Sequence, residues 1–536
     1  MPVLRYYTTL FALLCFFSSI QAQVDEQEVG SAIAKLESVI EILNDSYIEN
    51  IDVKKASENA IVAMLQELDP HSVYIPADEY SKMREPLEGN FEGVGIRFDI
   101  LRDTIIIIST INDGPAERAG LKPGDQIVSI GHETVVGLGL SNKEVVEKLR
   151  GVKGSGVDVG IHRDNVKSVL HFNIIREKIP LYSVEAAYME SPTIGYIRIN
   201  KFSATTIQEF RKIIGQLKLQ GMESLILDLR NNGGGYLTAA VQLADDFLSK
   251  DQLIVYTQGR TFDTKEYKAT SRGAFEEGKL VVLINEGSAS ASEIVAGAIQ
   301  DWDRGLIIGR RSFGKGLVQK PFNLSDGSAI RLTIAHYYTP SGRSIQKPYK
   351  ESKTEYYNDI ASRYQNGEML SADKIAVNDT EKYYTKTTHR VVYGGGGITP
   401  DVFVPIDTLL QSPYFKSLMY GSVINHFALK YINENRNKII SRYENADDFY
   451  NTFRIDNRTL HEFTAFAVLE RIKHDEEEFK KVKELLKNKI KADIAQNIWG
   501  LSSYYKIDNQ CSHAYLKAVE VLQRNDQYVD LQVIND

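Results

Sequence analysis

Leu280-Val-Val-Leu-Ile-Asn-Glu-Gly-Ser-Ala-Ser-Ala-Ser-Glu293 is the stretch of sequence that decides the fold. Its first five residues are apolar and predict a buried strand, and the small residues after them lead into an apolar pattern at helical spacing. The same order of strand and helix recurs from about residue 180 to residue 343, which predicts an α/β layer. The predicted strands cover residues 194–199, 224–229, 280–284 and 306–309, and the predicted helices cover residues 205–217, 237–248 and 291–301.

Ser290 stands where the turn of this stretch becomes a helix. Ser290-Ala-Ser-Glu293 has the spacing of a capping box, so Ser290 is predicted at a helix N-terminus, where backbone N–H groups have no intrahelical partner. A hydroxyl placed there could attack a carbonyl while the N–H of Ala291 binds the resulting oxyanion. Taken alone, the segment is more typical of an ordinary helix cap.

Leu225-Ile-Leu-Asp-Leu-Arg-Asn-Asn-Gly-Gly-Gly235 predicts a second strand that ends in a turn. Glycine is required where the backbone approaches a ligand closely or adopts a positive φ. Gly234 or Gly235 could therefore supply a second N–H to the oxyanion. Asp228 and the polar residues after it are expected to brace the turn rather than to react. The alternative is a simple tight connection between a strand and a helix.

Lys315 lies in Gly309-Arg-Arg-Ser-Phe-Gly-Lys-Gly316. The segment nearly matches a phosphate-binding loop, but Gly316 replaces the required Ser or Thr and a strand is predicted to follow, so we reject nucleotide binding. We interpret Lys315 as the base for Ser290, a role that requires burial to lower the lysine pKa. Gln319 could orient the amine. On an ideal strand the two residues would be about 13 Å apart, so the contact requires a bend or a helical turn after Gly316.

The segment from about residue 91 to residue 163 has a different texture, rich in strands. Its helix begins with the capping box Ser141-Asn-Lys-Glu144, and Pro123-Gly-Asp125 precedes a predicted strand. This segment resembles a PDZ domain, in which a loop binds a peptide's terminal carboxylate and the next strand accepts the peptide by β-addition. The loop would consist of Gly93, Val94, Gly95 and Ile96. The alternative is a small β-rich module without a ligand.

The composition excludes several classes of function. The chain has 536 residues, 43% hydrophobic and 25% charged residues, and a net charge of −8, which is typical of a soluble protein and argues against nucleic acid as a partner. Ten histidines show no metal-ligand spacing, and the two cysteines, Cys15 and Cys511, form no pair with such spacing. We therefore expect neither a metal nor another cofactor.

The N-terminus resembles a secretory signal. Arg5 precedes the apolar run Leu10–Phe17, and small residues then lead to a predicted cleavage site after Ala22. We expect an exported protein, in a bacterial periplasm, because a single remaining cysteine allows no internal disulfide. An uncleaved segment that keeps the protein at the membrane is the alternative.

Together these segments resemble the carboxyl-terminal processing proteases, also called tail-specific proteases. The resemblance covers about residues 30–405, and the lysine motif follows the serine motif by 25 residues, as in that family. The matching motifs are Leu68-Asp-Pro-His-Ser72, the PDZ-like module, Asp228-Leu-Arg-Asn-Asn232, Gly287-Ser-Ala-Ser-Ala-Ser-Glu-Ile-Val-Ala-Gly297, Phe313-Gly-Lys-Gly-Leu-Val-Gln319, Thr339-Pro-Ser-Gly-Arg-Ser-Ile-Gln346 and Gly397-Ile-Thr-Pro-Asp401.

The resemblance implies a crotonase-like (ClpP-like) α/β protease core with an inserted PDZ domain. It also implies serine endoproteolysis near the C-termini of exported polypeptides with apolar tails. By position it assigns Ser290 as nucleophile, Lys315 as base and Gln319 as the partner of the lysine, with Ala291 and Gly234 as oxyanion donors. The family turn usually has proline where this chain has Gly233, which leaves open which glycine faces the substrate. A catalytically silent PDZ scaffold is the alternative function.

Two regions lie outside the common family pattern. One is a polar, tyrosine-rich insertion, and the other is a helix-rich C-terminus whose charged stretch, residues 473–489, has one apolar face. We interpret this stretch as a surface helix and leave open a contact with a second copy or an adaptor. The predicted boundaries are 1–22 for the signal peptide, 23–85 for an N-terminal helical region, 86–170 for the PDZ domain, 175–346 with 391–406 for the protease core, 347–390 for the insertion and 407–536 for the C-terminal helical region.

Overall fold

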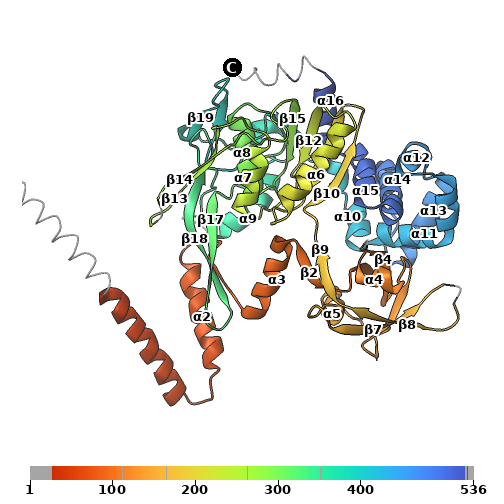
Figure 1. Ribbon diagram of the computed structural model, residues 1–536, viewed down its shortest axis with the longest axis horizontal. Coiled ribbons are helices and arrows are strands. Elements are labelled where there is room, and N and C mark those ends of the chain that lie inside the picture. Colours follow the sequence, from red (N-terminus) through yellow and green to blue (C-terminus); the bar gives the residue numbers. More distant parts are fainter. Residues whose placement is uncertain are drawn as a thin grey trace, which may run out of the picture. The chain divides into compact units, whose positions relative to one another are not determined.

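The computed structural model describes residues 27–111, 113–164, 166–261, 263–349, 353–524 and 528 (Figure 1). The predicted signal peptide, residues 1–22, lies outside this described part. The chain divides into two units, one made of residues up to Ala77 with Lys320–Leu332, and the other of Asp78–Gln319 with Thr333–Asp536. Within the described ranges, no helix has both the length and the apolar character that crossing a membrane requires.

The first unit contains N-terminal helices and the tip of a β hairpin. A helix over residues 27–46 precedes α2 (Val53–Gln66), and the carboxylate of Asp52 caps the first turn of α2. β1 (Val73–Ile75) then pairs antiparallel with the start of β18 (Ala329–Tyr338). The region predicted as helical at the N-terminus therefore contains these two helices, with a break between them.

The core of the second unit is a six-stranded sheet with the order β10-β11-β12-β15-β16-β21. β10 is antiparallel to β11, and every later neighbour in the sheet is parallel. The predicted strands and helices of the α/β layer are present, with ends that agree to within three residues. The strands are β10 (Val184–Met189), β11 (Ile194–Ile199), β12 (Ser224–Asp228), β15 (Lys279–Ile284), β16 (Leu306–Gly309) and β21 (Val402–Phe403), and the helices are α6 (Thr206–Leu219), α7 (Leu237–Asp245) and α8 (Ala291–Asp301).

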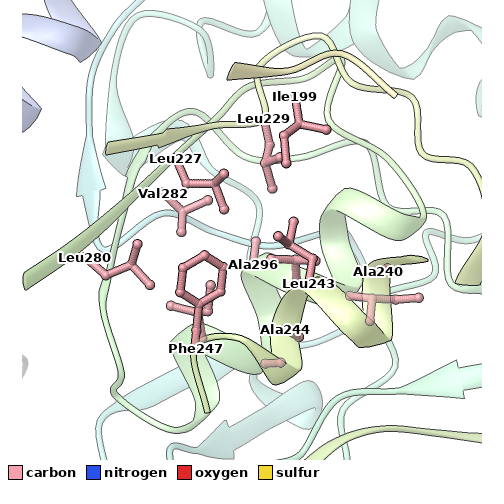
Figure 2. Packing of buried hydrophobic residues seen from close by; sticks show 14 of the residues in the cluster. Ile199, Leu227, Leu229, Ala240, Leu243, Ala244, Phe247, Leu280, Val282 and Ala296 are labelled. Atoms are coloured by element: carbon pink, nitrogen blue, oxygen red, sulfur yellow. The ribbon is translucent and has the colours of Figure 1, made fainter. Parts of the chain in front are cut away.

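One face of this sheet packs against α7 and α8. Figure 2 shows Leu227 of β12 and Val282 of β15 lying near Phe247, which follows α7. Ala296 of α8 belongs to the same cluster, and all four side chains are fully buried. Burial of each large apolar side chain contributes about 1.5–3 kcal/mol, so this layer holds the helix that carries Ser290 at its start.

The opposite face of the sheet is covered by α16 (His513–Gln523), from the end of the chain. Ile226 and Val281 point to this face because successive residues of a strand point to opposite sides, and they cluster with Tyr515 of α16. A sheet buried on both faces explains why its strands are continuous apolar runs. The C-terminal region is thus partly a layer of the core.

A second sheet has the order β3-β4-β5-β7-β8, with β6 pairing β5. Two helices accompany it, and the predicted capping box at Ser141 is present, because the Ser141 N–H donates to Glu144 Oε2 at 2.8 Å. The last strand reaches Ile175, past the predicted boundary at residue 170. The elements are β3 (Ile96–Leu101), β4 (Thr104–Thr110), α4 (Pro115–Ala119), β5 (Gln126–Ile130), β6 (Glu133–Thr134), α5 (Asn142–Leu149), β7 (Gly156–His162) and β8 (Leu170–Ile175).

The connections around this sheet are short and paired. The chain enters it through α3 (Ala77–Glu88) and β2 (Asn90–Gly93), and it leaves through β9 (Glu177–Pro180), which pairs antiparallel with β2. A further ribbon pairs β18 with β13 (Leu253–Gln258). β14 (Lys265–Lys268) pairs with β13, and β17 (Leu317–Asn323) pairs with β18.

The predicted insertion, residues 347–390, contains regular structure although its sequence shows little periodicity. Its helix is α9 (Lys353–Gln365), followed by the short helices η1 (Ala372–Lys374) and η2 (Asp379–Glu381). β19 (Lys382–Tyr384) then pairs with β20 (Val391–Tyr393). The insertion is therefore built into the second unit.

The C-terminal region is helical, as predicted. The apolar face of the charged stretch lies in α14, where Val482, Leu486 and Ile490 are buried in a cluster of this region's own helices. This face is therefore used within the chain, which argues against the contact with a second copy or an adaptor that we left open. The helices before α16 are η3 (Thr408–Gln411), α10 (Pro413–Tyr420), α11 (Val423–Arg442), α12 (Ala446–Thr452), α13 (Asn457–Leu469), α14 (Glu476–Trp499), α15 (Leu501–Asp508) and η4 (Asn509–Cys511).

Candidate active site

Ser290 immediately precedes α8, at the helix N-terminus that the capping-box spacing predicted. Its backbone has φ 56° and ψ −111°, a strained conformation for a residue other than glycine. Two hydrogen bonds fix the turn before it to the glycine turn. Asn285 Oδ1 accepts the N–H of Asn231, and Asn285 Nδ2 donates to Asn231 Oδ1, each at 2.8 Å. The surrounding hydrogen bonds therefore hold the serine in a geometry that a free chain would avoid.

Gly234 lies directly against the serine. Its φ is 101°, and a Cβ at this position would be 2.8 Å from the Cβ of Ser290 and 3.1 Å from the N of Ala291. Only glycine fits this approach. The N–H of Gly234 is already donated to Asn232 Oδ1 at 2.9 Å, so an oxyanion role requires that bond to be shared or exchanged. Gly235 lies instead against the carbonyl oxygen of Phe202.

Lys315 makes the predicted contact with Gln319, because its Nζ donates to Gln319 Oε1 at 2.9 Å. The contact does not use the helical turn that we offered as one explanation. Residues 311–316 have no regular secondary structure, and β17 begins directly after them at Leu317. Lys315 therefore lies outside the strand, and the ideal strand spacing does not apply to the pair.

Glu293 joins the serine and the lysine. The backbone N–H of Ser290 and that of Lys315 both donate to its Oε2, at 2.8 and 2.9 Å. Its Oε1 accepts from the hydroxyl of Ser312 at 2.5 Å and from the N–H of Gly314 at 2.7 Å. Burial raises the pKa of the Glu293 carboxyl, although the four donors oppose this shift. The capping-box spacing indicated the bond to Ser290 but gave no sign of the other three.

Tyr337, in β18, forms a second bridge between the same two residues. Its hydroxyl lies 3.1 Å from the carbonyl oxygen of Ser290 and 2.8 Å from that of Lys315, in position to donate to either. The side chain is buried, and burial raises its pKa well above the ordinary value, so it stays a neutral donor. No sequence pattern pointed to Tyr337, because a tyrosine in a strand is ordinary.

Asp228 braces the glycine turn, as the sequence indicated for this group of residues. It is fully buried and accepts hydrogen bonds from Tyr196 at 2.6 Å, Arg198 at 2.9 Å and Arg230 at 2.6 Å. Burial alone would raise the pKa of Asp228, but the charges of Arg230 and Arg198 outweigh it and hold the pKa well below its usual range. Arg230 also donates to Asn509 at 3.0 Å, which ties the turn to the C-terminal region.

The predicted peptide-binding loop connects β2 to β3. Gly93 ends β2, Ile96 begins β3, and between them Val94 is buried in the core of this domain. Gly95 has φ 77°, a backbone conformation that favours glycine, and a Cβ there would be 3.0 Å from the side chain of Ile179. β3 is the edge strand of its sheet, which is the position that β-addition of a peptide needs.

The β3–β4 hairpin contacts the C-terminal helical region through polar side chains, which the sequence did not predict. Asp99 Oδ2 lies 3.4 Å from His426 Nε2, and Arg102 forms an ion pair with Glu470 at 2.6 Å. Both partners belong to the C-terminal helical region. Across the residues that the structure describes, no cluster of three or more His, Cys, Asp or Glu side chains could hold a metal ion.

Comparisons with known proteins identify four segments. Residues 193–353 match peptidase family S41, residues 93–174 match the PDZ domain, residues 17–79 match the N-terminal domain of the activating protease CtpB, and residues 414–500 match a family of unknown function. The PDZ resemblance drawn from the sequence is therefore confirmed.

Two curated proteins and one solved structure give the scale of the similarity. The chain is 38% identical to the carboxy-terminal processing protease CtpB of Bacillus subtilis over 61% of this chain and 68% of that protein. It is 39% identical to the carboxy-terminal-processing protease of Bartonella bacilliformis over 60% of this chain and 74% of that protein. The photosystem II D1 C-terminal processing protease is 31% identical over 56% of this chain and 81% of that chain, with a TM-score of 0.34.

Proposed function

We propose that this chain, which belongs to peptidase family S41 and its carboxy-terminal processing serine proteases, is an exported endopeptidase with a Ser–Lys mechanism. Its PDZ domain would recognise the C-terminal tails of exported polypeptides. The observation that carries this proposal is the shared acceptor at Glu293, where the N–H groups of Ser290 and Lys315 meet. One carboxylate thereby joins two motifs that are 25 residues apart.

The chemistry follows from the roles of three side chains. Lys315, uncharged, takes the proton of the Ser290 hydroxyl as the serine oxygen attacks the peptide carbonyl. The Gln319 Oε1 accepts one N–H of the lysine and so aims the nitrogen lone pair toward the serine. The C–N bond then breaks, the leaving amine takes the proton from Lys315, and an acyl-enzyme ester remains. Water activated by Lys315 releases the acyl group.

The oxyanion would be bound by backbone N–H groups. Ala291 supplies the first of them, because it is the first residue of α8 and the first amides of a helix have no intrahelical partner. Gly234 supplies the second once its N–H turns away from Asn232, and Gly235 is the alternative. The mostly parallel sheet with helices on both faces supports a crotonase-like (ClpP-like) core.

Substrate selection would begin at the PDZ domain. A C-terminal tail would add as a further strand along β3, which lies at one end of its sheet, and its carboxylate would bind the loop formed by Gly93, Val94, Gly95 and Ile96. An apolar tail is favoured because Phe98 of β3 and Val145 and Leu149 of α5 belong to the hydrophobic cluster of this domain. The signal-like N-terminus supports export to the periplasm. Comparing the size of the protein before and after export tests this assignment, since removal of the signal would shorten it.

The rival function is a PDZ scaffold whose α/β domain is catalytically silent. It predicts that Ser290→Ala and Lys315→Ala leave every activity of the protein unchanged. The four-donor contact at Glu293 and the strained φ of Ser290 favour the enzyme, because a scaffold has no need to hold a serine in a costly conformation.

The decisive experiment incubates the protein, without its predicted signal, with an unfolded polypeptide that ends in apolar residues. We expect fragments from the wild type and from Lys320→Ala, an exposed lysine on β17, and none from Ser290→Ala or Lys315→Ala. The same polypeptide with charged side chains in place of its apolar C-terminal residues should be cleaved more slowly. Equal cleavage by wild type and Ser290→Ala would refute the serine mechanism, and equal cleavage of both tails would refute only the PDZ role.

A further inference from the structure

The loop that carries Lys315 has no regular structure of its own. It runs from Arg310 to Gly316, between the end of β16 and the start of β17. Gly314 has φ 89°, and a Cβ there would be 3.1 Å from the backbone N of Gly397. A loop of this kind keeps one conformation only if other parts of the chain bind its backbone groups. On one side it is bound by Glu293.

On the other side the loop is bound by Arg363, which belongs to α9 in the insertion. This side chain is only 2% exposed. Its Nη1 donates to the carbonyl oxygen of Ser312 at 2.7 Å and to that of Arg311 at 3.4 Å, and its Nη2 donates to that of Phe313 at 3.3 Å. A guanidinium group presents several donors in one plane, so it can bind successive carbonyl groups in a way that lysine cannot.

The neighbours of Arg363 orient it and extend the contact. Asp359, one turn earlier in α9, forms an ion pair with Arg363 at 2.9 Å and accepts a hydrogen bond from Lys347 Nζ at 3.0 Å. The backbone N–H of Lys347 donates to the Gly314 carbonyl oxygen at 3.0 Å, and its ammonium group lies 3.9 Å from the centre of the Phe313 ring. Four successive carbonyl groups before Lys315 are thus bound from the insertion side.

We propose that Arg363 is a positioning residue for Lys315, and that α9 of the insertion is a required part of the catalytic apparatus. The proposal rests on the proposed function. Glu293 binds the N–H groups of Gly314 and Lys315, while Arg363 binds the carbonyl groups just before them, so the loop is gripped along both edges of its backbone. Loss of either grip lets the lysine amine move away from the serine hydroxyl.

The test compares Arg363→Gln and Arg363→Lys with a matched arginine, Arg304. Arg304 also donates to three carbonyl groups, those of Phe247, Phe275 and Gly278. It precedes β16, whereas the Lys315 loop leaves the other end of that strand. The readouts are kcat and KM for a peptide that wild type cleaves and Ser290→Ala does not, the pH profile of kcat, and the thermal unfolding midpoint.

We expect Arg363→Gln to lower kcat about 100-fold with KM within about twofold, since a displacement on the order of 1 Å in a catalytic group has an effect of this size. The pH at which kcat falls on the acid side of its profile should change, because the environment of the Lys315 amine changes. Arg363→Lys, which can keep the ion pair with Asp359, should recover part of kcat and show a smaller shift of that pH. Arg304→Gln should lower the unfolding midpoint but keep the wild-type kcat and pH profile.

Three results would overturn the proposal. They are a kcat for the Arg363 variants within about twofold of wild type, an unmoved pH profile in both of them, and an equal loss of kcat in Arg304→Gln. Failure of the proposed function would look different, because Ser290→Ala would then cleave the peptide as fast as wild type does.

Discussion

The loop that carries Ser290 and the loop that carries Lys315 leave neighbouring parallel strands, β15 and β16, yet they are held by different means. The serine loop leads at once into α8, so a helix and its buried apolar side fix its position. The lysine loop leads into a hairpin and relies on Glu293 and on Arg363, which come from other elements. The serine is thus placed by local structure and the lysine by tertiary contacts.

This contrast has a consequence for how the site can fail. A helix packed on a sheet is stabilised by many small contributions, so single changes around it have limited effects. A loop held by a few buried polar groups depends on each of them, because a donor or acceptor left without a partner destabilises the fold by about 1–3 kcal/mol. The effects of substitutions at the serine loop and at the lysine loop should therefore differ in size.

Glu293→Gln should have the largest effect, because this residue acts on both loops. A carboxamide directs an NH₂ group at donors that now bind a carboxylate oxygen, so at least one of the four bonds is lost. We expect kcat to fall on the order of 10³-fold and the free energy of unfolding to fall by about 3 kcal/mol. Steady-state kinetics and denaturant unfolding measure the two effects.

The control for this substitution is Glu286→Gln, in the same turn. Glu286 forms an ion pair at 2.8 Å with Arg310, the first residue of the lysine loop, but the N–H groups of Ser290 and Lys315 donate to Glu293 instead. Its kcat should stay within about twofold of wild type, since partly exposed ion pairs contribute little. If Glu293→Gln were as active as Glu286→Gln, the hydrogen bonds of Glu293 would not be what holds the serine and lysine loops together.

Gly234→Ala tests the serine side and should have an intermediate effect. The new Cβ would lie 2.8 Å from the Cβ of Ser290 and 2.9 Å from the carbonyl oxygen of Ala289, at a φ of 101°. We expect kcat to fall about 100-fold and stability to fall by about 1–3 kcal/mol. Gly233→Ala is the matched control, because no heavy atom lies within 4 Å of its Cβ position. Similar kinetics for the two alanine variants would argue against a close approach of Gly234 to the serine.

Asp228→Asn should have the smallest effect on kcat of these substitutions, and it should change how the stability of the fold depends on pH. The pKa of Asp228 is lower in the folded protein than in the unfolded chain, so its contribution is fully present above the unfolded pKa of about 4 and is lost as pH falls below it. Asp228→Asn should be less stable at neutral pH and should lose less stability on acidification than wild type. Thermal unfolding between pH 3 and 7 measures this difference.

The control for Asp228 is Asp447→Asn, which removes an exposed ion pair with Lys506. Its unfolding midpoint should follow the wild-type curve at every pH. Parallel curves for wild type and Asp228→Asn would mean that charge does not brace the glycine turn.

The sequence was sufficient for the parts of the site that local pattern controls. Continuous apolar runs gave the strands from Ile194 to Gly309, and a capping-box spacing placed Ser290 at a helix N-terminus. The glycine turn was visible in the run from Gly233 to Gly235, and the PDZ domain was identified by its resemblance to a known domain. The catalytic roles of the predicted residues remain proposals that the Ser290 and Lys315 variants test.

The sequence was insufficient for groups that act across long separations. Tyr337 and Arg363 look like an ordinary strand residue and an ordinary helix residue, and nothing nearby in the chain shows that their side chains reach the lysine loop. The sequence of the insertion shows little periodicity because α9 buries mainly polar and aromatic side chains and so lacks an apolar stripe. α16 appeared to belong to a separate helical region although it covers one face of the core sheet.

By itself, the amino-acid sequence determined four strands and three helices of the α/β layer, where glycine is needed in the turn before α7, and which hydroxyl stands at the start of a helix. These properties depend on backbone sterics and on residues within a few positions of one another. Only the tertiary structure decided that Glu293, Tyr337 and Arg363 hold the lysine loop beside the serine. Hydrogen bonds between distant segments depend on how the packed elements bring their side chains together, and no local pattern records that outcome.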